Sequence, residues 1–144
     1  MSFGVDVNIL LYASDDTSEH HEKAAAFVRR CAAGPEVFCI AWLTAMSYLR
    51  MATHNRIFRN PLTPAQALGN IEALLSLPHC RAIGEDVEHL AVFRDITKAA
   101  PARANTVPDA HLAAVLRQNG VVTLYTHDRD FHRFDFLNVK DPLV

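Results

Sequence analysis

Residues 107–131, VPDAHLAAVLRQNGVVTLYTHDRDF, decide the fold that the sequence predicts. Apolar residues in the first half follow helical spacing up to Asn119-Gly120, and glycine is favoured just beyond a helix C-terminus. The next run, 121–125, is apolar and rich in β-branched residues, as a buried strand should be. It leads into a polar segment that contains Asp128 and Asp130. Ligands bind beyond the carboxyl ends of strands in open parallel sheets, so this unit places both aspartates where sites are built.

The rest of the chain alternates short apolar strands with helices. Strands are predicted at residues 3–5, 37–40, 81–83 and 136–139, and further helices at 7–13, 19–33, 42–53, 64–77 and 86–99. Such alternation is typical of an α/β sandwich with a mostly parallel sheet. With 144 residues, half of them hydrophobic and 21% charged, the chain is expected to form one domain over residues 1–144.

Charge and cysteine content narrow the class of protein. A net charge of −2 gives no global basic field, so any nucleic acid must bind at a local patch. Cys31, Cys39 and Cys80 are an odd number with no CxxC pair, which predicts reduced, buried thiols. No stretch reaches the roughly 18 apolar residues of a membrane span, and the N-terminus has no secretion signal. A cytoplasmic protein with no membrane partner is therefore predicted.

Four aspartates lie at junctions between elements, on the predicted edge of the sheet: Asp6, Asp109, Asp128 and Asp130. Converging carboxylates repel and raise one another's pKa unless a cation neutralises them. All-oxygen ligands favour Mg²⁺ or Mn²⁺, which can activate water and stabilise the oxygens of a phosphodiester. Singly, each aspartate has a simpler explanation as a helix cap, a first-turn acid or a turn former. Only the joint arrangement favours a metal site.

Four segments carry a resemblance to a known family: 6–13 (DVNILLYA), 42–53 (WLTAMSYLRMAT), 109–114 (DAHLAA) and 126–131 (THDRDF), with Asp141-Pro142-Leu143 at the end. In this order and spacing the chain resembles the PIN-domain ribonucleases, and among them the VapC-type toxins of type II toxin–antitoxin pairs. The resemblance implies a PIN-like, Rossmann-like three-layer sandwich, whose short, mostly parallel sheet of roughly four or five strands is flanked by helices. It also implies Mg²⁺- or Mn²⁺-dependent endoribonuclease activity with metal-activated water, a cognate VapB-type antitoxin and a homodimer.

The resemblance assigns roles to the acids. The family's first acid falls on Asp6, the acid at the start of its late helix on Asp109, and its strand-end acid on Asp128, and these three are the implied metal ligands. Asp130 matches a frequent additional acid. All four are therefore the predicted catalytic residues.

Polar and basic residues are expected to support this site. Asn8 and Thr126 match polar positions beside the metal pocket, where a hydroxyl can hold a carboxylate or a water, although cap or turn chemistry explains them equally well. Because arginine pairs phosphates and stacks on bases, a basic segment is a candidate for RNA binding, with a solvated loop as the alternative. The candidates are Arg50, His54, Arg56, Arg59 and Arg129.

One position departs from the family. Many PIN domains carry a glutamate just before the aromatic-Leu-Arg segment, where this chain has Ser47. Losing a ligand carboxylate weakens the binding of hard cations. A catalytically weakened PIN module that acts by binding RNA or antitoxin is therefore the alternative function. A phosphohydrolase with Asp6 as covalent nucleophile is disfavoured, because Asn8 stands where that chemistry usually needs a second acid.

Apolar side chains leave one more question open. Trp42 and Phe27 are predicted to lie in the core. The apolar face of residues 68–77 either packs in the core or contributes to a dimer or antitoxin surface. His111 and His127 flank the acids and are expected to be structural or exposed rather than to bind phosphate.

Overall fold

The computed structural model describes residues 2–144, and within them five parallel strands form one sheet in the order β3-β2-β1-β4-β5. The strands are β1 (Phe3–Val5), β2 (Phe38–Ala41), β3 (Cys80–Ile83), β4 (Thr123–Tyr125) and β5 (Asn138–Lys140). The first strand of the chain is thus the middle strand of the sheet, where Gly4 pairs with Cys39 on one side and Leu124 on the other. The predicted parallel α/β sheet is confirmed.

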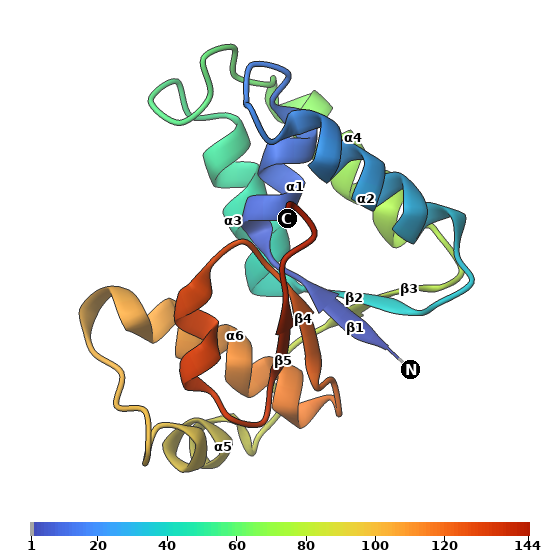
Figure 1. The fold of residues 1–144 in the computed structure, drawn as a ribbon. Coiled ribbons are helices and arrows are strands. Elements are labelled where there is room, and N and C mark those ends of the chain that lie inside the picture. The colour runs from blue at the N-terminus through green and yellow to red at the C-terminus, as the bar shows by residue number, and fades with distance from the viewer. Residues whose placement is uncertain (1) are drawn as a thin grey trace.

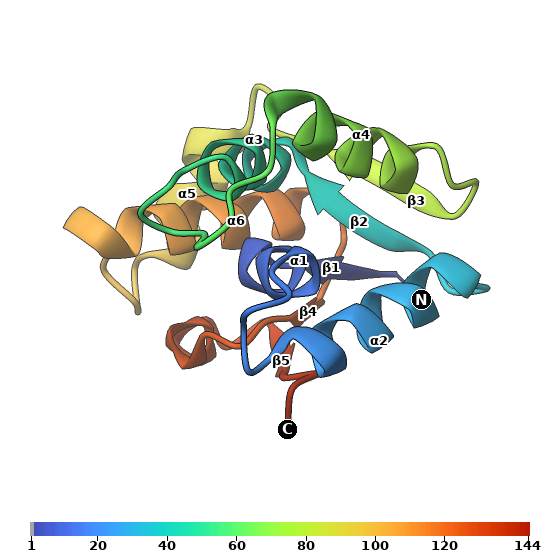
Figure 2. The same cartoon turned by 90° about the horizontal axis from the view of Figure 1, so that it is seen from above.

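Helices cover both faces of the sheet. They are α1 (Val7–Ser14), α2 (His21–Ala33), α3 (Trp42–Ala52), α4 (Pro64–Leu75), α5 (His89–Ile96) and α6 (Val107–Gln118), with short 3₁₀ helices η1 (Ala104–Thr106) and η2 (Arg129–Arg133). Helices α1 to α4 lie on one side and α5 and α6 on the other, which gives the three layers of a sandwich (Figure 1). Seen from above, α1 lies over the middle of the sheet, with α2 towards β4 and β5 and α4 towards β2 and β3 (Figure 2).

Strand β2 separates two hydrophobic cores. Phe38 and Ile40 pack in the core under α1 to α4, whereas Cys39 and Ala41 pack in the core over α5 and α6. This alternation follows from the strand itself, because successive side chains point to opposite faces. All four side chains are at most 3% exposed, so β2 is buried on both faces, as the continuous apolar run predicts.

Helix α6 packs unusually close to the sheet. Residues 112–116 are all buried, and Leu116 lies directly against β1. A Cβ added to Gly4 would lie 2.7 Å from Leu116 Cδ2, a separation that real side chains do not tolerate. Glycine in β1 is therefore what lets α6 approach and carry its first turn to the edge of the sheet.

Local signals fix the ends of the best-predicted helices. Thr63 accepts a hydrogen bond from the Gln66 backbone (3.1 Å) while Gln66 accepts one from the Thr63 backbone (2.9 Å), a capping box that starts α4 at Pro64. Past the end of α6, Gly120 has φ +70°, a left-handed conformation that favours glycine.

Other boundaries differ from the predicted ones. Helix α2 begins at His21, not at residue 19, because Ser18 accepts a hydrogen bond from the His20 backbone and holds that segment in a turn. Helix α5 spans only His89–Ile96 of the predicted 86–99, since Asp86 accepts from the Glu88 backbone in a turn. Strands β4 and β5 each begin two residues later than predicted.

Burial bears out one aromatic prediction and overturns another. Phe27 is 5% exposed, as predicted, but Trp42 is 49% exposed and its predicted core position is wrong. Trp42 is the first residue of α3, and one edge of its ring packs against Gly84, where an added Cβ would lie 3.1 Å from Trp42 Cδ1. Cys31, Cys39 and Cys80 are free and buried, as predicted. No helix within residues 2–144 is long and apolar enough to cross a membrane.

Candidate active site

Three carboxylates converge at the carboxyl edge of the sheet. Asp109 comes from the first turn of α6, Asp128 from the N-cap of η2 and Asp130 from η2 itself. One oxygen of each lies within 4.8 Å of the others. Helix α6 contacts η2, so two segments that are about 20 residues apart in the chain contribute to one group of acids.

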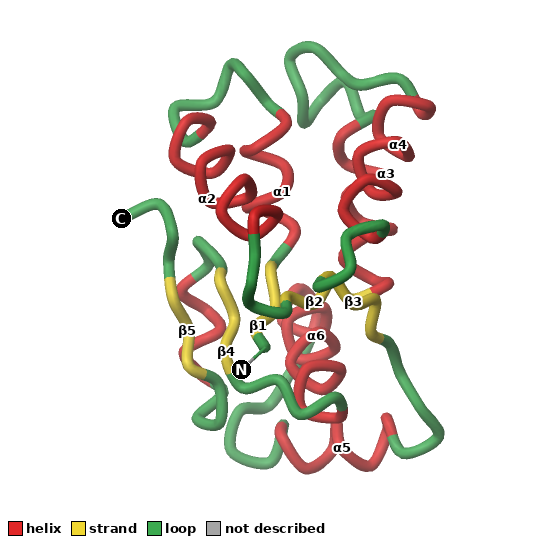
Figure 3. Tube along the Cα trace, turned by 90° about the vertical axis from the view of Figure 1, so that its right-hand side faces the viewer, coloured by secondary structure: helices red, strands yellow, loops and turns green. Residues whose placement is uncertain are grey.

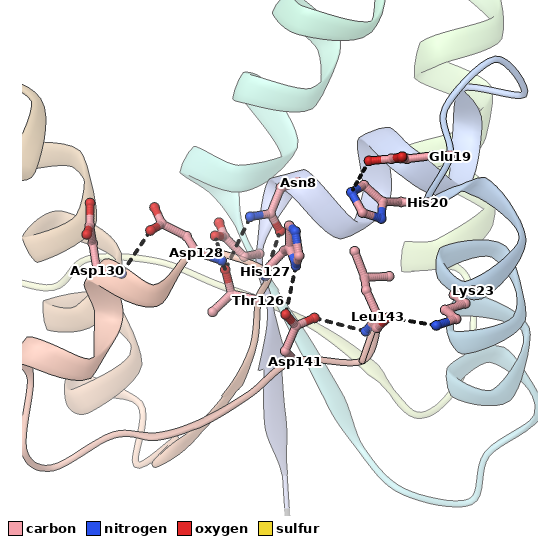
Figure 4. A network of polar contacts seen from close by, with 11 residues as sticks. Asn8, Glu19, His20, Lys23, Thr126, His127, Asp128, Asp130, Asp141 and Leu143 are labelled. Carbon is pink, nitrogen blue, oxygen red and sulfur yellow. Dashed lines mark hydrogen bonds and ion pairs between the residues drawn. The ribbon is translucent and has the colours of Figure 1, made fainter.

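The turn between β4 and η2 aims two of these acids. The Asp128 backbone N–H donates to Thr126 Oγ1 at 3.0 Å, and the Asp130 backbone N–H donates to Asp128 Oδ1 at 2.9 Å (Figure 4). Each short bond ties a residue to the one two positions before it. The two carboxylates are thus held on the same side of the turn, facing the start of α6.

Asp6 sits beside this group and not within it. Its Oδ1 accepts from the Val7 backbone at 2.8 Å and its Oδ2 accepts from the Thr126 hydroxyl at 2.8 Å. The carboxylate is 8% exposed and caps α1 at the end of β1. The group within 4.8 Å therefore contains Asp109, Asp128 and Asp130, and the metal-ligand role that the sequence predicts for Asp6 stays a prediction.

Thr126 links the acids to one another. Its hydroxyl, on a side chain that is 1% exposed, donates to Asp6 and accepts from the Asp128 backbone and from Asn8 Nδ2 at 3.3 Å. Asn8 in turn accepts from the His127 backbone at 3.5 Å. The two polar residues named from the sequence thus join β1 and α1 to the turn that carries Asp128.

Negative charge accumulates at the site. Burial, followed by the charges of Asp128, Asp6 and Asp130, raises the pKa of Asp109 from 3.8 to about 6, and Arg133 opposes that rise. Burial is also the main cause that raises the pKa of Asp6, against the hydrogen bonds that lower it. Crowded carboxylates of this kind are the donor set that hard divalent cations prefer, so the residues fit Mg²⁺ or Mn²⁺.

Basic residues divide into two locations. Arg129 lies on η2 between Asp128 and Asp130. The other predicted RNA-binding residues, Arg50, His54, Arg56 and Arg59, are exposed and lie at the end of α3 and in the loop that follows it. That loop is at the end of α3 remote from the sheet, so the structure does not bring it to the acids (Figure 1).

Three features of the site have no signal in the local sequence. Arg133 donates through Nε to the Asp130 carbonyl at 3.1 Å, and it lies two residues beyond the segment 126–131 that the sequence marks. His127 pairs with Asp141 at 2.7 Å and His111 pairs with Glu85 at 2.6 Å. Both histidines are structural, as expected, but only the folded chain identifies partners that are 14 and 26 residues away. Ser47 is half-buried on α3 and brings no acid.

Known proteins resemble the chain in sequence and in fold. Residues 4–137 match the family model described as PIN domain. Ribonuclease VapC48 of Mycobacterium tuberculosis is 40% identical over 142 residues, covering 99% of this chain and 98% of that protein. Ribonuclease VapC37 of the same organism is 30% identical over 138 residues, or 96% and 95% of the two chains.

Solved structures share the fold at lower identity. VapBC2 from Rickettsia felis, bound to a DNA fragment from its promoter, superposes with a TM-score of 0.67 at 14% identity and 98% coverage of both chains. VapC20 of Mycobacterium tuberculosis, a sarcin-ricin loop cleaving toxin, has a TM-score of 0.64 at 18% identity, covering 90% and 92%. These likenesses concern the fold alone.

Proposed function

Since this chain belongs to the PIN-domain family, among the VapC ribonucleases, we propose that it is a Mg²⁺- or Mn²⁺-dependent endoribonuclease that acts as the toxin of a VapBC-type toxin–antitoxin pair. One observation carries the proposal: oxygens of Asp109, Asp128 and Asp130 lie within 4.8 Å of one another. The rise of the Asp109 pKa to about 6 supports it, because such a group gains most from a cation.

Each acid has a proposed role. Asp6, Asp109 and Asp128 are the proposed metal ligands, and Asp130, whose oxygen lies within 4.8 Å of those of Asp109 and Asp128, completes the proposed catalytic set. Asp6 is tied to the Asp128 turn by the Thr126 hydroxyl. A bound divalent ion supplies an activated water and stabilises the oxygens of the phosphodiester. Thr126 and Asn8 keep the carboxylates in place, as partners behind metal ligands do.

RNA is proposed to enter over η2. Arg129 and Arg133 lie on the same short helix as Asp130, and the Arg133 side chain is oriented by its bond to the Asp130 carbonyl. Guanidinium groups pair phosphates bidentately, so these two are placed to meet the backbone beside the scissile bond. The basic loop after α3 would contact RNA further along the strand.

Cleavage of a structured RNA pool by the purified chain tests the proposal. We expect cutting with Mg²⁺ or Mn²⁺ and none in EDTA, and a loss of more than about 100-fold in Asp109→Asn, since even outer partners of a metal ligand contribute up to that factor. Asp16→Asn, which changes an exposed acid, is the matched control and should cut like wild type. Cutting in EDTA, or full activity in Asp109→Asn, would refute the metal-dependent nuclease.

Ser47 favours a second function, that of a catalytically weakened PIN module that acts by binding RNA or antitoxin. The residue is half-buried on α3 and contributes no carboxylate. Mn²⁺ titration of wild type and Ser47→Glu in the same cleavage assay separates the two. Cutting by the variant alone would establish the weakened module, whereas equal cutting by both would show that the four aspartates suffice.

An antitoxin is the proposed partner. Its proposed site is a groove on the side of the sheet that α1 to α4 cover. The groove, of about 470 Å³, is lined by residues of α1, α2, α3 and α4. Figure 3 shows the pair α1 and α2 beside the pair α3 and α4. Its lining is mainly apolar: Leu10, Ala13, Val28, Ala32, Ile71, Ala73, Leu74 and Leu77. Within it, the Tyr48 hydroxyl bonds to Ser14 Oγ at 2.7 Å and to Asn70 Nδ2 at 2.9 Å. We assign the groove to an apolar segment of a VapB-type antitoxin, since neighbouring folds include VapBC pairs.

A homodimer is the last part of the proposal. Trp42 and Met46, one helical turn apart on α3, are 49% and 53% exposed. Large apolar side chains on one exposed face are typical of protein contacts, and we assign this face to a second copy of the chain.

A further inference from the structure

Residues 141–144 form a strap on the side of the sheet that α1 to α4 cover. After β5, Leu143 inserts into the core with α1 and α2 and is only 4% exposed. Lys23 Nζ on α2 donates to the Leu143 carbonyl at 3.1 Å, and the Leu143 backbone N–H donates to Asp141 Oδ1 at 2.9 Å. Residues 141–144, called the strap below, are thus anchored at both a side chain and the backbone.

His127 connects this strap to the turn that carries the acids. Its Nδ1 lies 2.7 Å from Asp141 Oδ2, and its ring packs against the rings of His20 and Tyr12, with centroids 4.8 and 6.1 Å away. Figure 4 shows Asp141 between His127 and Leu143, while Asp128 and Asp130 lie on the other side of Thr126. His127 therefore faces the strap and not the carboxylates.

We propose that Asp141 is a positioning residue of the nuclease centre, which fixes the turn of residues 126–128 through His127. That turn has no regular structure of its own: Asn8 contacts it from α1, and the Thr126 backbone N–H donates to the Lys140 carbonyl of β5 at 2.9 Å. Asp141 adds the side-chain contact that holds the His127 ring. Metal ligands act only within a narrow range of positions, so the hold on this turn sets how well Asp128 and Asp130 meet Asp109. The catalytic part of this inference rests on the proposed function, whereas the anchoring part rests on the geometry alone.

The two oxygens of Asp141 provide matched variants. Asp141→Asn can keep both contacts, because its amide oxygen accepts from the Leu143 backbone and its amide nitrogen donates to His127 Nδ1 in the other tautomer. Asp141→Ala keeps neither. Asp141→Ser retains a short acceptor for the Leu143 backbone N–H but cannot reach His127. It replaces Asp141→Ala in the experiments if the alanine variant does not fold. Asp135→Ala removes an exposed acid from the same region as a control.

Amide hydrogen exchange of the metal-free protein tests the anchor. We expect faster exchange of residues 126–131 in Asp141→Ala and Asp141→Ser, and wild-type exchange in Asp141→Asn and Asp135→Ala. The exchange measurement needs neither metal nor RNA, so its result does not depend on whether the protein has nuclease activity. Unchanged exchange in both Asp141→Ala and Asp141→Ser would overturn the anchor.

Mn²⁺ affinity, measured by electron paramagnetic resonance of the free ion, and RNA cleavage test the positioning role. Asp141→Ala should weaken Mn²⁺ binding about 10-fold and lower kcat with little change in KM. Asp141→Asn should keep the Mn²⁺ affinity and the kcat of the wild type. In a His127→Ala background the same substitution should have no further effect, because Asp141 acts through His127. Wild-type Mn²⁺ affinity and kcat in Asp141→Ala, or an undiminished effect without His127, would overturn the role. If wild type neither binds Mn²⁺ nor cuts RNA, the proposed function and the catalytic role of Asp141 fail together, and exchange alone judges the anchor.

Discussion

The Thr126 hydroxyl has one proton to donate, and it donates this proton to Asp6. Its lone pairs then accept from Asn8 and from the Asp128 backbone, so a single buried oxygen joins one acid to the turn that carries another. This arrangement holds several carboxylates close together, and their repulsion lowers the stability of the fold when they are ionised. The effect is largest at Asp109, because burial and three neighbouring carboxylates raise its pKa to about 6.

The raised pKa of Asp109 predicts how stability depends on pH. The folded chain keeps the Asp109 proton up to about pH 6, whereas the unfolded chain releases it near 3.8, so ionisation opposes folding as the pH rises between these values. Asp109→Asn removes the charge. In EDTA the variant should therefore be more stable than wild type above pH 6, by about 1 kcal/mol after allowing for solvent screening, and equally stable below about pH 4.

Urea unfolding of both proteins at pH 4 and pH 7.5 measures this difference. Asp16→Asn, an exposed acid, should show no such dependence. A variant at Asp109 that is destabilised at pH 7.5, or a difference that does not change with pH, would contradict the account.

Among the elements, β1 and α6 determine where the acids lie. Strand β1 is the middle of the sheet and ends at Asp6, and α6 begins with Asp109 in its first turn. The contact of Gly4 with Leu116 sets the separation of the two elements, since no other residue leaves room for the leucine. The close packing at Gly4 thus helps to bring Asp6 at the end of β1 near Asp109 at the start of α6.

Gly4→Ala tests this contact. The added methyl would lie 2.7 Å from Leu116 Cδ2, and Leu116 is 1% exposed and has little space to move. We expect a loss of about 1–3 kcal/mol of unfolding free energy, as for other overpacked cores. Gly69→Ala on α4 is the control: nothing lies within 4 Å of the new methyl, so alanine should stabilise the helix by about 0.5–1 kcal/mol. Chemical denaturation of the two variants should therefore give shifts of opposite sign, and equal shifts would count against the close contact.

Elements with local signals are the ones that the sequence predicts well. Thr63-Pro64 starts α4 and Gly120 follows α6, because capping and left-handed turns depend on residues that are adjacent in the chain. The aspartates are predictable for the same reason, since each follows a strand or opens a helix. Pairings across the fold are not: His127 with Asp141 depends on how β4 and β5 align, which no local pattern records. The exposure of Trp42 is likewise not recorded locally, because the neighbour of its ring, Gly84, follows another strand.

At the scale of the whole molecule, the acids and the groove belong to different parts of the fold. The acids lie where α6 and η2 meet, whereas the groove is lined by α1 to α4. Figure 1 shows α6 and α1 to α4 on opposite faces of the sheet. Helix α1 contributes to both, through Asn8 beside the acids and Leu10 in the groove. Binding in the groove and cleavage at the acids should therefore be separable by mutation.

Ala73→Arg should separate them. Ala73 is exposed on α4 and lines the groove, so an arginine there blocks an apolar partner without disturbing the core. We expect it to lose binding to the proposed VapB-type antitoxin by at least about 10-fold, as for a central interface residue, while RNA cleavage stays at the wild-type rate and escapes inhibition. Calorimetric titration and the cleavage assay measure the two effects. Ala65→Arg, exposed on the same helix, should bind like wild type; an Ala73→Arg protein that is still bound and inhibited would place the antitoxin elsewhere.

The order of the strands in the sheet has a consequence for the cell that makes this chain. The middle strand, β1, is synthesised first, but its neighbour β4 begins only at Thr123 of 144 residues. A nascent chain therefore carries Asp6 long before Asp128 exists. The group of Asp109, Asp128 and Asp130 can form only after residue 130 has been made, so a polypeptide that stops before this point holds no complete set of acids.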